Sequence, residues 1–207
     1  MERTQGDDTA SSRAIGSEED LRRRLSYATP ADTVRGIFLN SVLEMVRQLG
    51  DEATVLRCLE ESGEKRFVDL FNYPVSTLLR MSYAGARLLS SDSREFGEVM
   101  RQMGYLSARS FASSTMGRLM LKLILGHPRL LLDALPSAHR LTTSAGECKV
   151  QWTGASSAVV LITRDFLPHA YMEGSLQGAF EAVKIRGLTV RARPLEPLAT
   201  EYDLSWG

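Results

Sequence analysis

Side chains that could bind a metal or act as a nucleophile are few and widely separated in this chain. The two cysteines, Cys58 and Cys148, are 90 residues apart, and no C-x-x-C pair occurs. The three histidines, His127, His139 and His169, fall in three separate segments that we expect to be loops. A tetrahedral zinc site needs about four thiolate or imidazole ligands close together. The sequence therefore predicts neither a metal site nor a disulfide framework, as is typical of a reducing compartment.

Motifs of the common catalytic mechanisms are absent as well. The chain has no G-x-x-x-x-G-K-[ST] phosphate loop, no G-x-G-x-x-G after a strand and no G-x-S-x-G sequence. A serine-rich stretch at 107–114 is explained by helix capping. Cys148 alternates with apolar residues, which indicates an inert core position. We therefore expect no enzyme activity and no catalytic residue.

A ligand pocket is the remaining chemical hypothesis. Five aromatic or cationic residues lie on segments that we expect to line the gap between a helical layer and a sheet: Tyr73, Arg80, Tyr83, Arg118 and Tyr171. Small-molecule sites are mostly apolar with a few polar groups, and these residues would supply the polar groups. In the alternative, the tyrosines pack in the core, while the arginines pair with Asp69, Glu95 or Glu98.

Composition and charge exclude several classes of protein. Lys plus Arg equals Asp plus Glu, so the formal net charge is zero, which argues against a general nucleic-acid or anionic-membrane binder. The longest apolar run, 119–125, contains Lys122 and is much shorter than the ~20 residues of a membrane span. The polar N-terminus lacks the apolar segment of a signal peptide. We expect a cytoplasmic protein without a membrane span.

The first two-thirds of the chain are predicted to be helical. Residues 1–28 are expected to be a disordered tail, with at most a marginal helix after Ser17, and residues 29–207 a single α+β domain. Apolar residues at three- and four-residue steps predict helices over 30–49, 51–63 and 74–90. A fourth helix follows Ser93, with Gly104 as a break or bend. Residues 114–125 are apolar on almost every side, which predicts a buried central helix. A short helix over 128–134 would end before Pro136.

The last third has a different periodicity. Alternation of apolar and polar residues predicts strands at 147–153, 188–193 and 201–206, and a continuous apolar strand at 158–163. A helix over 169–186 lies between the two strand pairs. It carries Gly174 and Gly178, four residues apart on one face, where they allow close packing against a neighbouring element. The expected fold is α+β: an N-terminal helical layer packed on a small antiparallel sheet, with a strand-strand-helix-strand-strand C-terminal unit.

Several short sequences resemble a paralogous family of uncharacterised myxobacterial proteins, and the resemblance covers about 29–207. They include Phe67-Val-Asp-Leu-Phe-Asn-Tyr-Pro74, Trp152-Thr-Gly154, Arg164-Asp-Phe-Leu-Pro168 and Glu201-Tyr-Asp-Leu-Ser-Trp206. The resemblance implies no activity.

The strand-strand-helix-strand-strand order with glycines four apart is also similar to a superfamily. It comprises the 4-vinyl-reductase-type domains, the haem nitric-oxide-binding domains and the TRAPP vesicle-tethering subunits. This resemblance implies a ligand held between helices and sheet, often in a dimer, and many such relatives act as sensors. The stretch 193–202, where vinyl-reductase-type relatives carry cysteines, has neither Cys nor His here.

Haem-binding relatives use a Tyr-x-Ser-x-Arg motif on the strand before the glycine-bearing helix. Here that strand keeps only Arg164. Tyr105-Leu-Ser107-Ala-Arg109 matches the motif in a predicted helix, which is the wrong context. We therefore expect no haem or other cofactor.

These observations favour a non-enzymatic small-molecule-binding or sensory domain that signals to a partner protein. From the resemblance to the superfamily we expect a homodimer and a small apolar ligand. The alternative is a protein-interaction scaffold resembling TRAPP subunits without a bound ligand.

Overall fold

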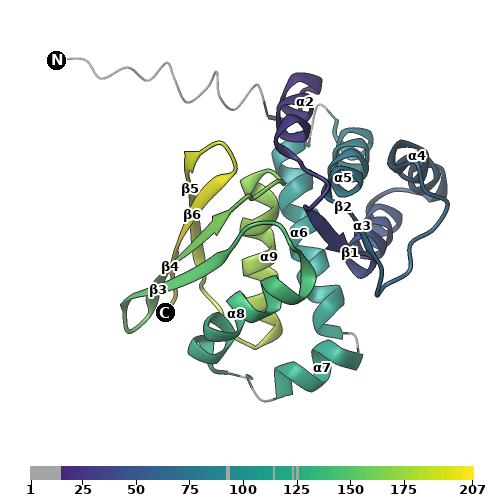
Figure 1. Cartoon of the computed structure of the whole chain (residues 1–207). Coiled ribbons are helices and arrows are strands. Elements are labelled where there is room, and N and C mark those ends of the chain that lie inside the picture. Colours follow the sequence, from purple (N-terminus) through teal and green to yellow (C-terminus); the bar gives the residue numbers. More distant parts are fainter. Residues whose placement is uncertain (1–14, 92–93, 114, 123, 125) are drawn as a thin grey trace.

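The computed structural model describes residues 15–91, 94–113, 115–122, 124 and 126–207. The first half of the chain is a layer of helices with a two-stranded antiparallel sheet at one end (Figure 1). Its elements are α2 (Glu18–Tyr27), β1 (Thr33–Arg35), α3 (Gly36–Leu49), α4 (Glu52–Ser62), β2 (Asn72–Pro74), α5 (Val75–Leu89) and α6 (Phe96–Ser113).

The second half is a four-stranded antiparallel sheet with helices on one face. Two helices precede it, α7 (Thr115–Lys122) and α8 (Pro128–Thr142). The remaining elements are β3 (Cys148–Gly154), β4 (Ser157–Thr163), α9 (His169–Ala182), β5 (Thr189–Glu196) and β6 (Ala199–Ser205). The strand order is β3-β4-β6-β5. The fold class is therefore α+β, and the predicted strand-strand-helix-strand-strand unit is confirmed.

The alternation of residue types decides which face of the sheet is buried. Val160 on β4 lies between Val150 of β3 and Tyr202 of β6, and all three side chains belong to one apolar core. The neighbouring residues point to the other face, where Lys149 and Glu201 flank Leu161. Helices α8 and α9 cover the apolar face with Leu132, Leu176 and Phe180.

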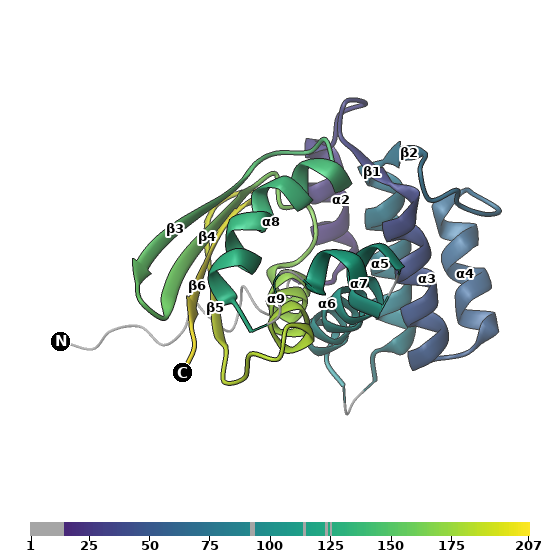
Figure 2. The ribbon, with the colours of Figure 1, turned by 90° about the horizontal axis from the view of Figure 1, so that it is seen from below.

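Helices α6 and α9 lie side by side between the sheet and the other helices (Figure 2). A methyl group on Gly174 would overlap the backbone carbonyl of Arg101, and one on Gly104 would overlap that of Tyr171. A Cβ on Gly178 would come within 2.5 Å of the Tyr105 carbonyl oxygen. The two backbones can approach so closely because these three positions lack side chains. Gly104, expected to break or bend its helix, lies inside the continuous helix α6.

The buried residues form two clusters, one on each side of this helix pair. One cluster comprises the interior of α3, α4, α5 and α6. The other lies between the sheet and α8 and α9. Tyr171 belongs to the first cluster, while Leu176, five residues later on the same helix, belongs to the second. Helix α9 therefore joins the two halves of the domain.

The N-terminal segment differs from its prediction. Within residues 15–28, expected to be part of a disordered tail, α2 is a capped helix whose Asp20 and Leu21 are buried. Ser17 caps it by accepting a hydrogen bond from the Asp20 amide at 3.1 Å. Residues 1–14 lie outside the described residues. The following helix begins at Gly36 rather than at residue 30, because residues 33–35 pair with β2.

Two further helix predictions are wrong. The segment predicted as the central helix forms the short peripheral α7, where Leu119 is 68% exposed, and α6 takes the central place. An apolar run indicates burial only if neighbouring elements cover each side of it. Helix α8 continues through Pro136 to Thr142, which moves His139 from a predicted loop into a helix. Ser93, the predicted cap of α6, lies outside the described residues.

Candidate functional site

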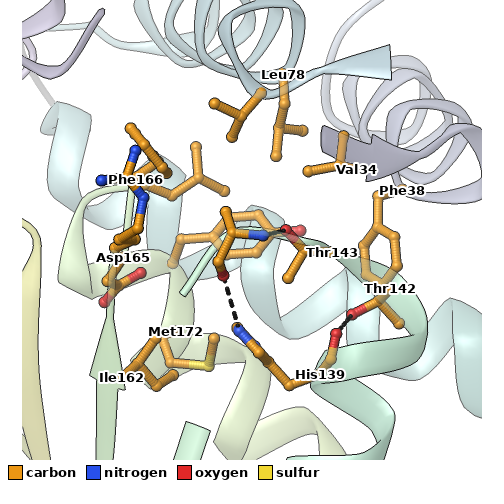
Figure 3. Close-up of a pocket in the computed structure, with 15 residues that line it drawn as sticks. Val34, Phe38, Leu78, His139, Thr142, Thr143, Ile162, Asp165, Phe166 and Met172 are labelled. Carbon is orange, nitrogen blue, oxygen red and sulfur yellow. Dashed lines mark hydrogen bonds between the residues drawn. The ribbon is translucent and has the colours of Figure 1, made fainter. Parts of the chain in front are cut away.

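An apolar cavity of about 130 Å³ lies where the helical half meets the sheet half (Figure 3). The helical half contributes Val34, Phe38, Val75 and Leu78. The sheet half contributes residues of β4, α8, α9 and the loops before β3 and α9: Ile162, His139, Thr142, Thr143, Ala145, Phe166, Leu167, Tyr171 and Met172. The side chains from the two halves face one another across the space (Figure 3). A molecule in this cavity would touch both cores at once.

Among the titratable side chains that line this mostly apolar space are His139 and Asp165, and burial favours the neutral form of each. Burial lowers the pKa of His139, although its Nε2 lies 3.1 Å from the carbonyl oxygen of Ala145. Burial also raises the pKa of Asp165, outweighing the 2.5 Å hydrogen bond that the Tyr202 hydroxyl donates to its carboxylate. Burial therefore disfavours the charged form of both side chains.

An ion pair at the rim ties the two halves together. Arg164, in the loop after β4, donates from Nε and Nη2 to the two carboxylate oxygens of Asp32, at 2.8 and 2.5 Å. Its Nη2 also donates to the carbonyl of Tyr27 at 3.0 Å. Burial alone would raise the pKa of Asp32, but the hydrogen bonds from Arg164 and Thr29 hold it below its ordinary value. Because Arg164 also lines the cavity, the pair forms part of its rim.

A second connection joins the end of α8 to β1. Ser144 donates its amide to the carbonyl of Thr33 at 3.0 Å and its hydroxyl to the carbonyl of Ala31 at 2.6 Å. The Thr143 hydroxyl donates to the same Thr33 carbonyl at 2.9 Å. Val34 and Thr143, both lining the cavity, face each other in an antiparallel bridge. We call the Arg164–Asp32 and Thr33–Ser144 contacts together the rim contacts.

The residues predicted to bind a ligand do not come together in the structure. Tyr171 lines the cavity, and burial raises the pKa of its hydroxyl. Tyr83 is buried elsewhere and donates its hydroxyl to Asp20 at 2.6 Å. The Tyr73 hydroxyl accepts the Val68 amide at 2.9 Å. Arg80 is exposed on α5. Arg118 donates to the Ser113 carbonyl at 2.6 Å and lines a different hollow beside α7.

Sequence reasoning left out several cavity residues for identifiable reasons. Val34 and Phe38 belong to the apolar period that predicts a helix over 30–49, and that period does not distinguish a core residue from a cavity wall. Arg164 stands out in the sequence only as the remainder of the Tyr-x-Ser-x-Arg motif. Because Pro136 predicts the end of the preceding helix, the sequence predicts a loop at His139. The buried position of Asp165 depends on its contact with β6, which has no signal in the local sequence.

Neither a metal cluster nor a membrane-spanning helix is found in the part of the chain that the structure describes. No group of three or more His, Cys, Asp or Glu side chains there could hold a metal ion. No described helix is long and apolar enough to cross a membrane. Tyr105, Ser107 and Arg109 lie in α6 and do not line the cavity, and the Tyr105 hydroxyl donates to Glu181 at 2.6 Å.

The fold is similar to solved structures of H-NOX domains. An oxygen complex of an H-NOX domain related to soluble guanylate cyclases has a TM-score of 0.62 at 11% identity, covering 83% of this chain and 94% of that chain. An S. oneidensis H-NOX protein in the Fe(II)NO ligation state has a TM-score of 0.62 at 16% identity, covering 84% of this chain and 99% of that chain. The Fe(II) unliganded H-NOX protein from K. algicida has a TM-score of 0.59 at 13% identity, covering 84% of this chain and 96% of that chain.

At these identities the likeness concerns the fold alone. No curated protein matches the chain. One protein family matches residues 27–207, which include every cavity-lining residue and exclude most of α2. The chain therefore belongs to the family described as protein of unknown function, DUF2378.

Proposed function

We propose that this protein is a non-enzymatic sensory domain that binds a small apolar molecule and signals to a partner protein. The observation that carries the proposal is the apolar cavity, whose walls come from both halves of the domain. The H-NOX-like fold supports it, since the similar structures include an oxygen-binding domain. A ligand in the cavity would favour one arrangement of the two halves, and a partner, or a second copy in a homodimer, would respond to that arrangement.

The size of the cavity restricts the ligand class. An engineered apolar cavity of roughly 150 Å³ holds benzene or xenon, and the present cavity is about 130 Å³. We therefore propose an apolar molecule no larger than one aromatic ring. Asp165 and His139, whose neutral forms are favoured by burial, could hydrogen-bond a single polar atom on such a molecule.

Haem, which H-NOX structures contain, does not fit the residues present. Pockets for drug-sized molecules measure about 300 to 1,000 Å³, and a haem is at least of that size. Among the described residues, His139 is the only histidine that lines the cavity, and its Nε2 lies 3.1 Å from a backbone carbonyl. Arg164, the arginine that lines the cavity, is bound to Asp32 rather than free to pair with a propionate. We propose that this protein uses the H-NOX-like fold without a haem.

Thermal unfolding with benzene as a probe tests the cavity. We expect benzene to raise the midpoint of the wild-type protein, because a ligand that binds only the folded state stabilises it by mass action. Leu78→Phe would fill the space and abolish the shift. Leu70→Phe, the same change at a residue that is 79% exposed, should leave the shift intact.

Leu78→Ala provides a second test of the cavity if Leu78→Phe fails to fold. By enlarging the cavity it should increase the response to a two-ring probe, naphthalene, relative to benzene. An unchanged benzene response in Leu78→Phe, or no response in any variant, would refute the proposal. Native mass spectrometry of the purified cytoplasmic protein should reveal any ligand that is retained.

The loop before β2 favours a second candidate, an interaction scaffold resembling TRAPP subunits. The side chains of Leu70 and Phe71 are 79% and 63% exposed. The loop backbone is nevertheless held by two hydrogen bonds, from the Arg35 guanidinium to the Leu70 carbonyl and from the Gly36 amide to the Phe71 carbonyl. A rigid loop that exposes two large apolar side chains is typical of a contact surface. If this loop joins two copies, Leu70→Ser/Phe71→Ser should convert a dimer into a monomer in analytical ultracentrifugation without changing the benzene response.

A further inference from the structure

A second hollow, in which four of the nine lining residues are basic, lies beside α7 at the ends of α6 and α9. It measures about 530 Å³ and takes four cations from three segments: Arg109, Arg118, Lys122 and Lys184. We propose that this basic hollow binds a small soluble anion carrying two or more phosphate groups. The proposal is independent of the apolar cavity, which shares no residue with it.

The cations of the basic hollow have few acidic partners. None of the four forms an ion pair within the part of the chain that the structure describes, whereas Arg23, Arg47 and Arg87 each pair with a carboxylate. The one acidic residue in the hollow, Glu181, already accepts the Tyr105 hydroxyl at 2.6 Å. The chain is neutral overall and has only four lysines, yet two of them lie here. A local excess of positive charge in a concave site attracts anions.

The backbone at Lys184 gives a separate reason to consider a role for its side chain. Lys184 follows the C-terminus of α9 and has a φ of 64°, in the left-handed region. Glycine is the usual residue at such a helix end because a side chain is disfavoured there. Lys184 therefore occupies a position where the backbone alone would favour glycine, and its side chain lines the basic hollow.

Helix dipoles give another explanation for these cations. Close contacts pair Arg101 with Gly174 and Tyr105 with Gly178, so α6 and α9 run in parallel and end on the same side. Each C-terminus carries about half a negative charge, and Arg118 already donates to the Ser113 carbonyl. Two half charges and Glu181 together balance only about two of the four cations. The remaining positive charge is available to a ligand.

The size and walls of the hollow indicate what the anion would be. A volume of 530 Å³ is within the range for small-molecule sites and far exceeds one phosphate. Ala112, Leu121 and Ala182 supply apolar wall on which a non-phosphate part could lie. Arginine forks bind phosphate through two hydrogen bonds, and lysines bind it as point charges. We therefore assign the hollow to a diphosphate or a molecule that carries one.

Isothermal titration calorimetry with inorganic pyrophosphate tests the assignment at constant ionic strength. We expect saturable binding of one pyrophosphate per chain, and about tenfold weaker binding for Lys184→Gly and for Lys122→Gln. Lys184→Gly relieves the left-handed strain, so its thermal midpoint should stay near that of the wild type. Lys65→Gln and Arg186→Gln remove exposed cations outside the hollow and should bind as the wild type does.

Three results would overturn the assignment. Pyrophosphate that fails to bind saturably would exclude the site, and equal weakening in the Lys65 and Arg186 variants would indicate nonspecific charge attraction. A lower thermal midpoint for Lys184→Gly with unchanged binding would show that the lysine only compensates the helix ends. The same binding measurement is repeated with ADP and with phosphatidylglycerol vesicles. Binding to vesicles but not to pyrophosphate or ADP would replace the soluble anion with a membrane surface.

Discussion

The three aspartates that are buried in the described part of the chain show how one residue type acquires different properties from its contacts. Burial tends to raise the pKa of all three. For Asp20 and Asp32, hydrogen bonds from Tyr83 or from Arg164 overcome this effect, so both remain ionised. Asp165 has hydroxyl partners, Tyr202 and Thr200, but no arginine in direct contact, and its pKa is raised. The carboxyl group nearest the cavity is therefore the one that is most easily neutral.

Asp165 should make stability depend on pH in a direction unusual for a carboxyl group. Because its folded pKa lies above its unfolded value of about 3.8, its contribution is complete below that pH and is lost as pH rises through the folded pKa. Asp165→Asn cannot ionise and keeps an oxygen that accepts from Tyr202. We expect the stability of the variant relative to the wild type to increase as the pH rises above about 4, because only the wild-type side chain can ionise.

Urea unfolding of both proteins at several pH values measures this difference. Asp203→Asn is the control, because Asp203 is an exposed aspartate on the neighbouring strand β6. Its effect should change little with pH. If Asp165→Asn instead loses stability relative to the wild type as pH rises, Asp165 is a stabilising carboxylate and its pKa is not raised.

At the scale of the elements, the close packing of α6 and α9 depends on the absence of a Cβ atom at the glycines between them. A Cβ at Gly174 would meet backbone atoms of Arg101 and Tyr105, which cannot rotate away as a flexible side chain can. Alanine normally favours a helix by up to about 1 kcal/mol over glycine. At this position the overlap should dominate, and we expect Gly174→Ala to destabilise the protein by about 2 to 4 kcal/mol.

Gly97 provides a matched control for that substitution. It lies in α6, and a Cβ added there would meet no atom within 4 Å. Gly97→Ala should therefore be neutral or slightly stabilising in the same urea titration. Equal destabilisation by both substitutions would contradict the packing role of Gly174.

The helices and strands that could be predicted are those in which a local period of apolar and polar residues indicates which face is buried. Alternation of Cys148, Val150 and Trp152 predicts a strand with one buried face, and the structure has that strand. The site could not be predicted in this way, because Val34 and Asp165 become neighbours of one cavity only through tertiary contacts. The prediction for 114–125 failed for the same reason: an apolar run does not reveal whether other elements cover it.

At the scale of the whole molecule, α2 acts as part of the domain although most of it precedes the family match. Asp20 accepts the buried Tyr83 hydroxyl, and Arg24 donates from Nη1 to the carbonyl of Phe166 at 3.0 Å. Phe166 lines the apolar cavity. The helix thus supports both the helical core and the loop that closes the cavity, so its loss should affect stability and ligand response together.

A chain that begins at residue 29 tests this role against one that begins at residue 15, which keeps every described contact of α2. The shorter chain leaves the Tyr83 hydroxyl without its acceptor and uncovers apolar surface around Leu21. We expect it to lose about 3 kcal/mol or more in urea unfolding. Its benzene response should also weaken, because Phe166 loses its contact with Arg24. Equal stability and equal benzene response of the two chains would show that α2 is dispensable, and that the domain begins with the family match near residue 27.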